Sequence, residues 1–450
     1  MHGVKRTPKS STSAEARAAR KAKEAAKLSA YLEIESTFFT YKRERRHDQT
    51  ALEHTTKLLT LNPELYTVWN FRREVLLALF GGSAEGQVKK DVFADLRNPS
   101  QNQQGAKQPE EEDASRTHLR QNLLEDDLLL TEHALRAHPK VYWIWNHRMW
   151  CLSHHPSASV WERELSLVAK MLDLDPRNFH GWNCRRAIIQ HLALSVLSSD
   201  PSTASFAARQ PVFPTLLSDP LLQSHPAVKE GLLGLAEREL AYTLRKIESN
   251  FSNFSAWHQR SKLLPHMWTA RQLSTEQVDG EVDKELELVK QAMYTDPGDQ
   301  SVWFYHRWLV EGLFEPMVHR TEGEGSRAKG EAATGEDGRV RVAKSEAGTT
   351  GGKSANAQPG QSQERRKSRQ LTVLREEIGV IEELFELEPE SKWCAISLAH
   401  YQMLLAGLQG DTKDSAEAKG KAKRLLEELI ELDPDREQRY RDLLEGKAYF

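Results

Sequence analysis

One short stretch gathers residue types that could bind a metal ion. Cys151 lies close to His147, His154 and His155, and thiolate and imidazole are common zinc ligands in proteins. The spacing matches neither a paired-cysteine site nor a helical His-Glu-x-x-His site, and two of the histidines stand in a turn next to Pro156. We therefore expect solvated or packed histidines here, and we predict no metal site in this chain.

Other catalytic chemistry leaves no clear pattern. The sequence shows no Gly-rich phosphate loop between a strand and a helix, no acidic calcium loop, and no nucleophile in a recognisable triad context. Three cysteines in 450 residues give no disulfide framework. Taken alone, the chain is typical of a binding or wrapping surface and not of a self-sufficient enzyme.

A repeated phrase dominates the sequence instead. A polar residue, usually followed by Pro, stands seven positions before a Trp in five copies (69 − 62, 145 − 138, 182 − 175, 257 − 250, 303 − 296). Arg follows three residues after the Trp, or four in the fifth copy, and chance does not keep such a register. The pairs are Trp69 and Arg72, Trp145 and Arg148, Trp182 and Arg185, Trp257 and Arg260, and Trp303 and Arg307. We predict structural roles for all of them: Trp fills a core, and Arg pairs with a neighbouring repeat.

Each copy predicts a helical hairpin. Apolar residues recur at helical spacing over residues 51–61, and Asn62-Pro63 ends that helix because the residue before Pro is disfavoured in the α region. We expect the Asn or Asp also to cap the second helix. The closest copies are 37 residues apart (182 − 145), which leaves room for two helices of about 12–15 residues. The fold class is therefore an all-α solenoid without a sheet.

Wider gaps between copies indicate inserts at about residues 81–118, 198–226 and 322–368. The last is rich in Gly, Ser, Lys and Glu with almost no large apolar residue, which predicts disorder. Residues 1–30, rich in Lys, Ala and Arg, are expected to form a disordered basic tail that leads into a solvated helix. Residues 31–450 then form the helical-repeat domain.

The composition excludes some classes of protein. A formal net charge of −3 does not fit a globally basic nucleic-acid binder, and no apolar run approaches the roughly 20 residues of a membrane helix. The N-terminal residues have no apolar core of a secretory signal. With few cysteines and no disulfide framework, a cytoplasmic protein is expected.

The pattern Pro-x-x-Tyr/Phe-x-x-Trp-x-x-Arg resembles the repeat of protein prenyltransferase α subunits. Residues 139–148 and 176–185 carry it in full, and residues 62–73 are similar. The resemblance covers most of residues 30–440 apart from the inserts. The opening Met1-His2-Gly3 and residues 301–309 look most like the Rab (type II) geranylgeranyltransferases, in a short, fungal-type form.

This resemblance implies a crescent-shaped, right-handed superhelix of hairpins around a β subunit that holds zinc and the lipid pocket. The implied reaction transfers geranylgeranyl from geranylgeranyl diphosphate to C-terminal cysteines of Rab GTPases, which a Rab escort protein presents. Lys140 would be catalytic by stabilising negative charge on the leaving diphosphate. Tyr142, Asn178 and His180 would bind substrate. His2 is a weak candidate ligand for the partner's zinc.

Two alternatives stay open. The first is the α subunit shared by farnesyltransferase and type I geranylgeranyltransferase, which typically has a Pro-rich tail that this chain lacks. The second is a non-catalytic helical-repeat adaptor, in which Lys140 is an ordinary turn lysine. Because other copies carry Glu64, Arg177 and Gly298 at this position, the Lys is not a general requirement of the repeat.

Overall fold

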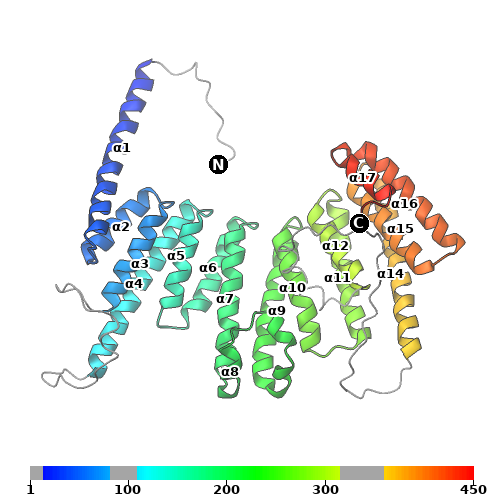
Figure 1. Cartoon of the computed structure of the whole chain (residues 1–450), viewed down its shortest axis with the longest axis horizontal. Coiled ribbons are helices and arrows are strands. Elements are labelled where there is room, and N and C mark those ends of the chain that lie inside the picture. The colour runs from blue at the N-terminus through cyan, green and yellow to red at the C-terminus, as the bar shows by residue number, and fades with distance from the viewer. Residues whose placement is uncertain (1–13, 82–108, 315–358) are drawn as a thin grey trace, which may run out of the picture. The chain divides into compact units, whose positions relative to one another are not determined.

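The computed structural model describes residues 14–81, 109–314 and 359–450. The first thirteen residues with His2, and the greater part of the inserts predicted at 81–118 and 322–368, lie outside the described residues. Throughout the described ranges the chain is α-helical, with short 3₁₀ turns and no strand, which confirms the predicted all-α class (Figure 1). None of the helices in these ranges is long and apolar enough to cross a bilayer.

The chain divides into two compact units between Leu192 and Ala193. The helices of the first unit are α1 (Ala14–Arg43), α2 (Gln49–Leu61), α3 (Tyr66–Phe80), α4 (Pro109–Ala137), α5 (Tyr142–His154), α6 (Val160–Leu174) and the start of α7 (Phe179–Ser198). From α2 onward they pair as the hairpins α2/α3, α4/α5 and α6/α7. Each hairpin contains one copy of the repeated phrase.

The second unit begins with the short elements η1 (Pro201–Thr203), α8 (Ala204–Ala207), η2 (Thr215–Ser218) and η3 (Pro220–Ser224). Its main helices are α9 (Pro226–Ser249), α10 (Phe254–Ala270), α11 (Thr275–Thr295), α12 (Gln300–Gly312), α14 (Pro359–Leu387), α15 (Lys392–Gln409), α16 (Lys413–Leu432) and α17 (Glu437–Leu444), with η5 (Pro434–Arg436) between the last two. As in the first unit, consecutive helices pair as hairpins.

The polar residue before Pro ends the first helix and does not cap the second, which corrects our expectation. The backbone N–H of Asn62 bonds to the carbonyl of Leu58, while its side chain accepts the N–H of Glu64 inside the turn. Asn250 and Asp296 accept the N–H two residues ahead in the same way. Such an Asx turn reverses the chain locally. Three residues therefore lie between the Asn or Asp that ends the first helix and the start of the second helix.

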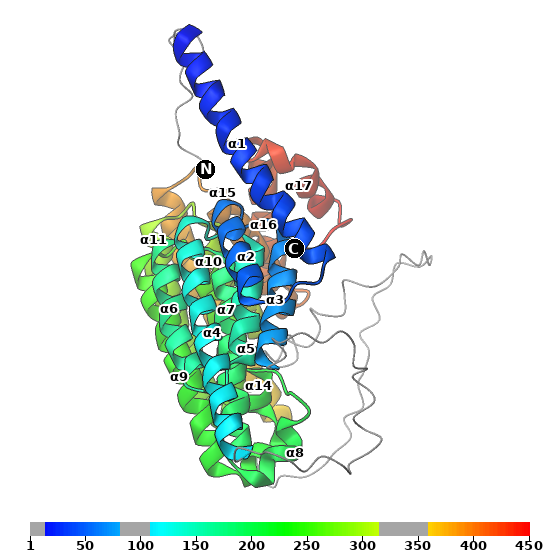
Figure 2. The same cartoon turned by 90° about the vertical axis from the view of Figure 1, so that its left-hand side faces the viewer.

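Residues 14–30 of the predicted tail form the start of helix α1. All residues from 14 to 30 are exposed in the first half of α1, which extends beyond the ends of α2 and α3 (Figure 2). Its many Ala residues have the highest intrinsic helix propensity, and Arg20 and Glu24 form an i,i+4 ion pair at 2.9 Å. Tertiary contacts begin at Tyr31, whose hydroxyl accepts from Nδ2 of Asn62 at 3.1 Å, and Phe38 further along α1 is buried.

The insert predicted at 198–226 is ordered. Its short helices bury Phe206, Leu216, Leu217 and Leu222, and η2 and η3 pack against α9 while η2 also packs against α10. These four apolar side chains supply the burial that offsets the entropy of ordering. Between the two closest copies, α5 and α6 span 13 and 15 residues as predicted, whereas α4 and α14 each span 29.

Candidate functional site

In five hairpins the Trp fixes the turn of its own hairpin. It is the fourth residue of the second helix, and its Nε1 donates to the carbonyl oxygen six residues earlier at 2.8–2.9 Å. The acceptors belong to Pro63, Pro139, Pro176, Phe251 and Pro297. Because the bond uses a backbone carbonyl, Phe251 serves as well as Pro. The Trp is therefore a core residue that also holds the turn.

The Arg three residues later bridges neighbouring hairpins. Arg148 donates to the carbonyl of Leu128 at 2.5 Å and to Oγ1 of Thr131 at 2.8 Å in its own hairpin. Its Nε and Nη2 reach both carboxylate oxygens of Glu164 in the next hairpin at 2.6 Å each. The Arg72–Asp127 and Arg260–Glu285 pairs repeat this bidentate contact. All these side chains are buried, so each bridge combines charge with fixed geometry.

The fifth copy uses His at the position of the Arg. His306, three residues after Trp303, contacts Glu377 through Nε2 and Tyr401 through Nδ1, both at 2.8 Å. Arg307 instead pairs with Glu311 on its own helix at 2.6 Å. Successive helical residues point about 100° apart, so a shift by one residue turns the Arg away from the next hairpin. His306 thus takes the role that the pattern assigned to Arg307.

The acidic partners of the Arg residues also follow a fixed spacing in the sequence, which our prediction missed. Asp127, Glu164 and Glu285 each stand eighteen residues before the Trp of their own hairpin (145 − 127, 182 − 164, 303 − 285). At that position on the first helix, the carboxylate meets the Arg of the preceding hairpin. The repeated phrase therefore includes an acid as well as Trp and Arg.

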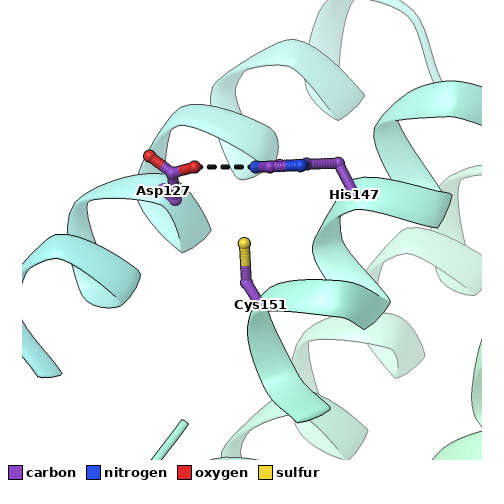
Figure 3. Close-up of side chains that lie close together, drawn as sticks. All are labelled: Asp127, His147 and Cys151. Atoms are coloured by element: carbon purple, nitrogen blue, oxygen red, sulfur yellow. Dashed lines mark hydrogen bonds and ion pairs between the residues drawn. The ribbon is translucent and has the colours of Figure 1, made fainter. Parts of the chain in front are cut away.

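A buried cluster joins Asp127 to His147 and Cys151 (Figure 3). Nε2 of His147 lies 2.7 Å from Oδ2 of Asp127, while its Nδ1 accepts from Nε of Arg73 at 3.2 Å. The proton of a neutral imidazole therefore sits on Nε2 and points to the carboxylate. Of the three nearby histidines considered above, only His147 takes part, since His154 and His155 bond elsewhere.

The electrostatics of this cluster disfavour a metal ion. Burial, together with the charge of Asp127, raises the pKa of the Cys151 thiol well above its usual value, and burial lowers the pKa of His147. Arg72 already contacts both oxygens of Asp127. A zinc ion would need a thiolate and an open carboxylate beside two guanidinium groups, and this cluster supplies neither. We interpret it as part of the bridge between hairpins.

The buried carboxylate of Asp127 should make part of the free energy of unfolding sensitive to acid. Burial alone would raise the pKa of its carboxyl, but the charge of Arg72 and the hydrogen bonds from His147 and Arg72 lower it from 3.8 to about 2. A carboxyl group whose pKa is lower in the folded than in the unfolded state stabilises the fold fully at pH values above the unfolded pKa. This stabilisation is lost as the pH falls towards 2. The free-energy difference between wild type and Asp127→Asn, measured by urea unfolding, should narrow by about 1 kcal/mol from pH 5 to pH 3. A constant difference would contradict this role.

Lys140 lies in the exposed turn between α4 and α5. Its side chain is 77% exposed, and its Nζ lies 3.5 Å from Oδ2 of Asp175, which ends α6. An ion pair this exposed contributes little, so the ammonium can exchange it for another anion. Tyr142, at the start of α5, is also exposed, and its ring centre lies 5.9 Å from that of His180 on α7. The structure brings these three residues together at the turns of consecutive hairpins.

Asn178 does not fit the substrate-binding role implied by the resemblance. Its side chain is buried at 5% exposure. Its Oδ1 accepts the backbone N–H groups of His180 and Gly181 at 3.0 and 3.4 Å, and its Nδ2 donates to the carbonyl of Pro139 at 3.0 Å. Both ends of the amide are committed inside the protein, so Asn178 caps α7 and joins two turns.

Hairpins that share a turn hydrogen bond and a buried Arg–carboxylate bridge define a helical-repeat scaffold with exposed turns. A model of the "Protein prenyltransferase alpha subunit repeat" matches residues 48–79, 124–155, 161–192, 236–267 and 282–313. Each matched range covers one hairpin turn with its Trp. The chain belongs to the protein prenyltransferase α subunit family.

Individual relatives give a more specific comparison than the family model. The chain is 29% identical over 455 residues to "Geranylgeranyl transferase type-2 subunit alpha" of Schizosaccharomyces pombe, covering 99% of this chain and 98% of that protein. The human protein of the same name is 34% identical over 319 residues, covering 70% of this chain and 43% of the human one. A solved structure, "Candida albicans protein geranylgeranyltransferase-I complexed with GGPP", is similar at 17% identity with a TM-score of 0.49, covering 93% and 91% of the two chains.

Proposed function

We propose that this chain is the α subunit of a heterodimeric type-2 geranylgeranyltransferase that modifies C-terminal cysteines of Rab GTPases. Relatives of that name support the assignment, and the yeast S. pombe relative extends over nearly the whole chain. The observation that carries the chemical part is the exposed ammonium of Lys140 in a turn that buried residues hold in place. By family resemblance, the subunit pairs with a β subunit.

In the proposed reaction the cysteine sulfur attacks C1 of geranylgeranyl diphosphate. The C1–O bond breaks, its electron pair leaves with the diphosphate, and a thioether forms. We place zinc, whose chemistry is to hold the cysteine as a thiolate, in the β subunit. Lys140 of this chain donates to the leaving diphosphate and stabilises the negative charge that grows on its oxygens.

A row of aromatic rings on the first unit supports docking of the β subunit on the same side as Lys140. Ring centres lie 5.2 Å apart for Tyr66 and Trp143, 5.1 Å for Trp143 and Tyr142, and 3.9 Å for His180 and Phe179. Tyr66, Tyr142 and Phe179 are more than half exposed. Exposed aromatic patches are typical of protein interfaces, and a partner there would cover the Lys140 turn.

Further parts of the proposal concern partners and location. A Rab escort protein presents the Rab substrate to the heterodimer, which works in the cytoplasm. All three cysteines of the chain are buried and form no disulfide, which suits a reducing compartment. His2 near the zinc of the partner remains a weaker hypothesis.

Reconstitution with the β subunit tests the function. We expect a 1:1 zinc-containing complex that transfers geranylgeranyl to a Rab protein only when escort protein is added, and that modifies a short CaaX peptide poorly. Preference for the CaaX peptide would instead indicate the farnesyltransferase/type I subunit. A zinc-free partner, or no transfer to either substrate, would favour the adaptor. Native mass spectrometry with metal analysis checks the complex, and transfer of labelled lipid checks the reaction.

A further inference from the structure

The carbonyl that directly precedes Lys140 is held from two hairpins. The oxygen of Pro139 accepts Nε1 of Trp145 at 2.8 Å and Nδ2 of Asn178 at 3.0 Å. A carbonyl oxygen has two lone pairs, so both are used by side chains that are almost fully buried. The peptide group on the N-terminal side of Lys140 cannot rotate without breaking one of these bonds.

The second donor is itself rigidly placed. Asn178 is tied to the first turn of α7 by the N–H groups of His180 and Gly181. Gly181 packs closely on α6, because a Cβ there would lie 2.9 Å from Cδ2 of Leu172. The start of α7 therefore acts as a fixed support for the turn of the preceding hairpin. The partners also identify the oxygen and the nitrogen of the Asn178 side-chain amide, since a backbone carbonyl only accepts and a backbone N–H only donates.

His180 lies beside the same turn, and its ring centre is 5.9 Å from that of Tyr142. Burial lowers the pKa of His180, and the backbone of Lys140 partly opposes this shift. The start of α7 therefore borders the Lys140 turn with His180 as well as with Asn178.

We propose that Asn178 is a positioning residue for Lys140. The proposal rests on the function proposed for Lys140 above. A lysine side chain has four flexible bonds and is 77% exposed here, so the protein controls its reach mainly by fixing its Cα and the direction of Cα–Cβ. Misplacement of a catalytic group by about 1 Å can reduce the rate on the order of 10²-fold.

Asn178→Asp is the discriminating variant. An Asp at this position still accepts the N–H groups of α7 and remains a good helix cap, but it cannot donate to the carbonyl of Pro139 and repels it. In the reconstituted heterodimer we expect kcat to fall by about 10-fold while KM for geranylgeranyl diphosphate changes by less than about 3-fold. The double variant with Lys140→Ala should be no slower than Lys140→Ala alone, because residues that act as a unit are non-additive.

A second readout does not depend on catalysis. The N–H of Val141 bonds to the carbonyl of His138 at 3.2 Å across the same turn, so Asn178→Asp should speed hydrogen exchange at Val141 in the heterodimer. Ser391→Ala is the matched control. Oγ of Ser391 donates to the carbonyl of Pro297, which Trp303 also holds, and the next residue there is Gly298 and not Lys. This control should leave kcat unchanged.

The outcomes separate the two proposals. If Lys140→Ala slows turnover but Asn178→Asp does not, or if their effects multiply, the positioning role is wrong while the function stands. Unchanged exchange at Val141 would also overturn it. If Lys140→Ala itself is silent, the catalytic role of Lys140 fails and the positioning role fails with it.

Discussion

Replacing Lys140 with Ala should lower the turnover of the reconstituted heterodimer by roughly 10²–10³-fold, the usual effect of losing one group that stabilises developing charge. The ammonium lies in an exposed turn, and its ion-pair partner in the structure, Asp175, is a partly exposed carboxylate at 3.5 Å. The diphosphate carries more charge than Asp175 and gains more of it as the C1–O bond breaks. The contact is thus stronger in the transition state than in the ground state, so kcat falls more than KM rises.

The chain offers a matched control for this variant. Arg177 occupies the same position after Pro in the next hairpin and is exposed, so Arg177→Ala removes a cation from the neighbouring turn. We expect it to change turnover by less than about 3-fold, well within the range of a peripheral charge. Single-turnover kinetics under saturating geranylgeranyl diphosphate would isolate the chemical step. Equal effects of the two variants would point to a general electrostatic field and would remove Lys140 from the mechanism.

Replacing Glu164 with Ala should destabilise the first unit by about 3–5 kcal/mol, because it leaves the guanidinium of Arg148 buried without its counter-charge. The two side chains are only 4% and 3% exposed and are joined by two bonds of 2.6 Å. The transition that reports on this unit in urea unfolding of the full chain should move to a lower urea concentration.

The adjacent residue on α6 provides the comparison. Arg163 pairs with Glu125 at the same 2.6 Å, but its side chain is 58% exposed, so Arg163→Ala should cost less than about 1 kcal/mol. Replacing both Arg148 and Glu164 with apolar residues should recover part of the loss, since a buried pair stabilises little relative to good packing. If Glu164→Ala and Arg163→Ala cost the same, burial of the bridge is not what holds these hairpins together.

Local physics made the hairpins predictable from the sequence. The residue before Pro is disfavoured in the α region, and the Trp bonds a carbonyl only six residues away. These interactions close within one turn, so their spacing is the same in every copy. The all-α class and the position of each turn, including the turn that contains Lys140, followed from that spacing. The Ala-rich start of α1 was predictable in principle from helix propensity, although we assigned it to a tail.

Contacts between hairpins needed the tertiary structure. Arg72 and Asp127 are 55 residues apart, whereas Arg148 and Glu164 are 16 apart. The same bridge thus spans an insert in one case and a short turn in the other. His306 takes the place of the Arg at one bridge, and Asn178 bonds to the carbonyl before Lys140. No fixed spacing in the sequence links the segments that these contacts join. The sequence by itself determined where each hairpin turns because those forces act locally. Only packing decided which side chains meet across hairpins, because a buried charge or amide must find its partner on whatever surface lies against it.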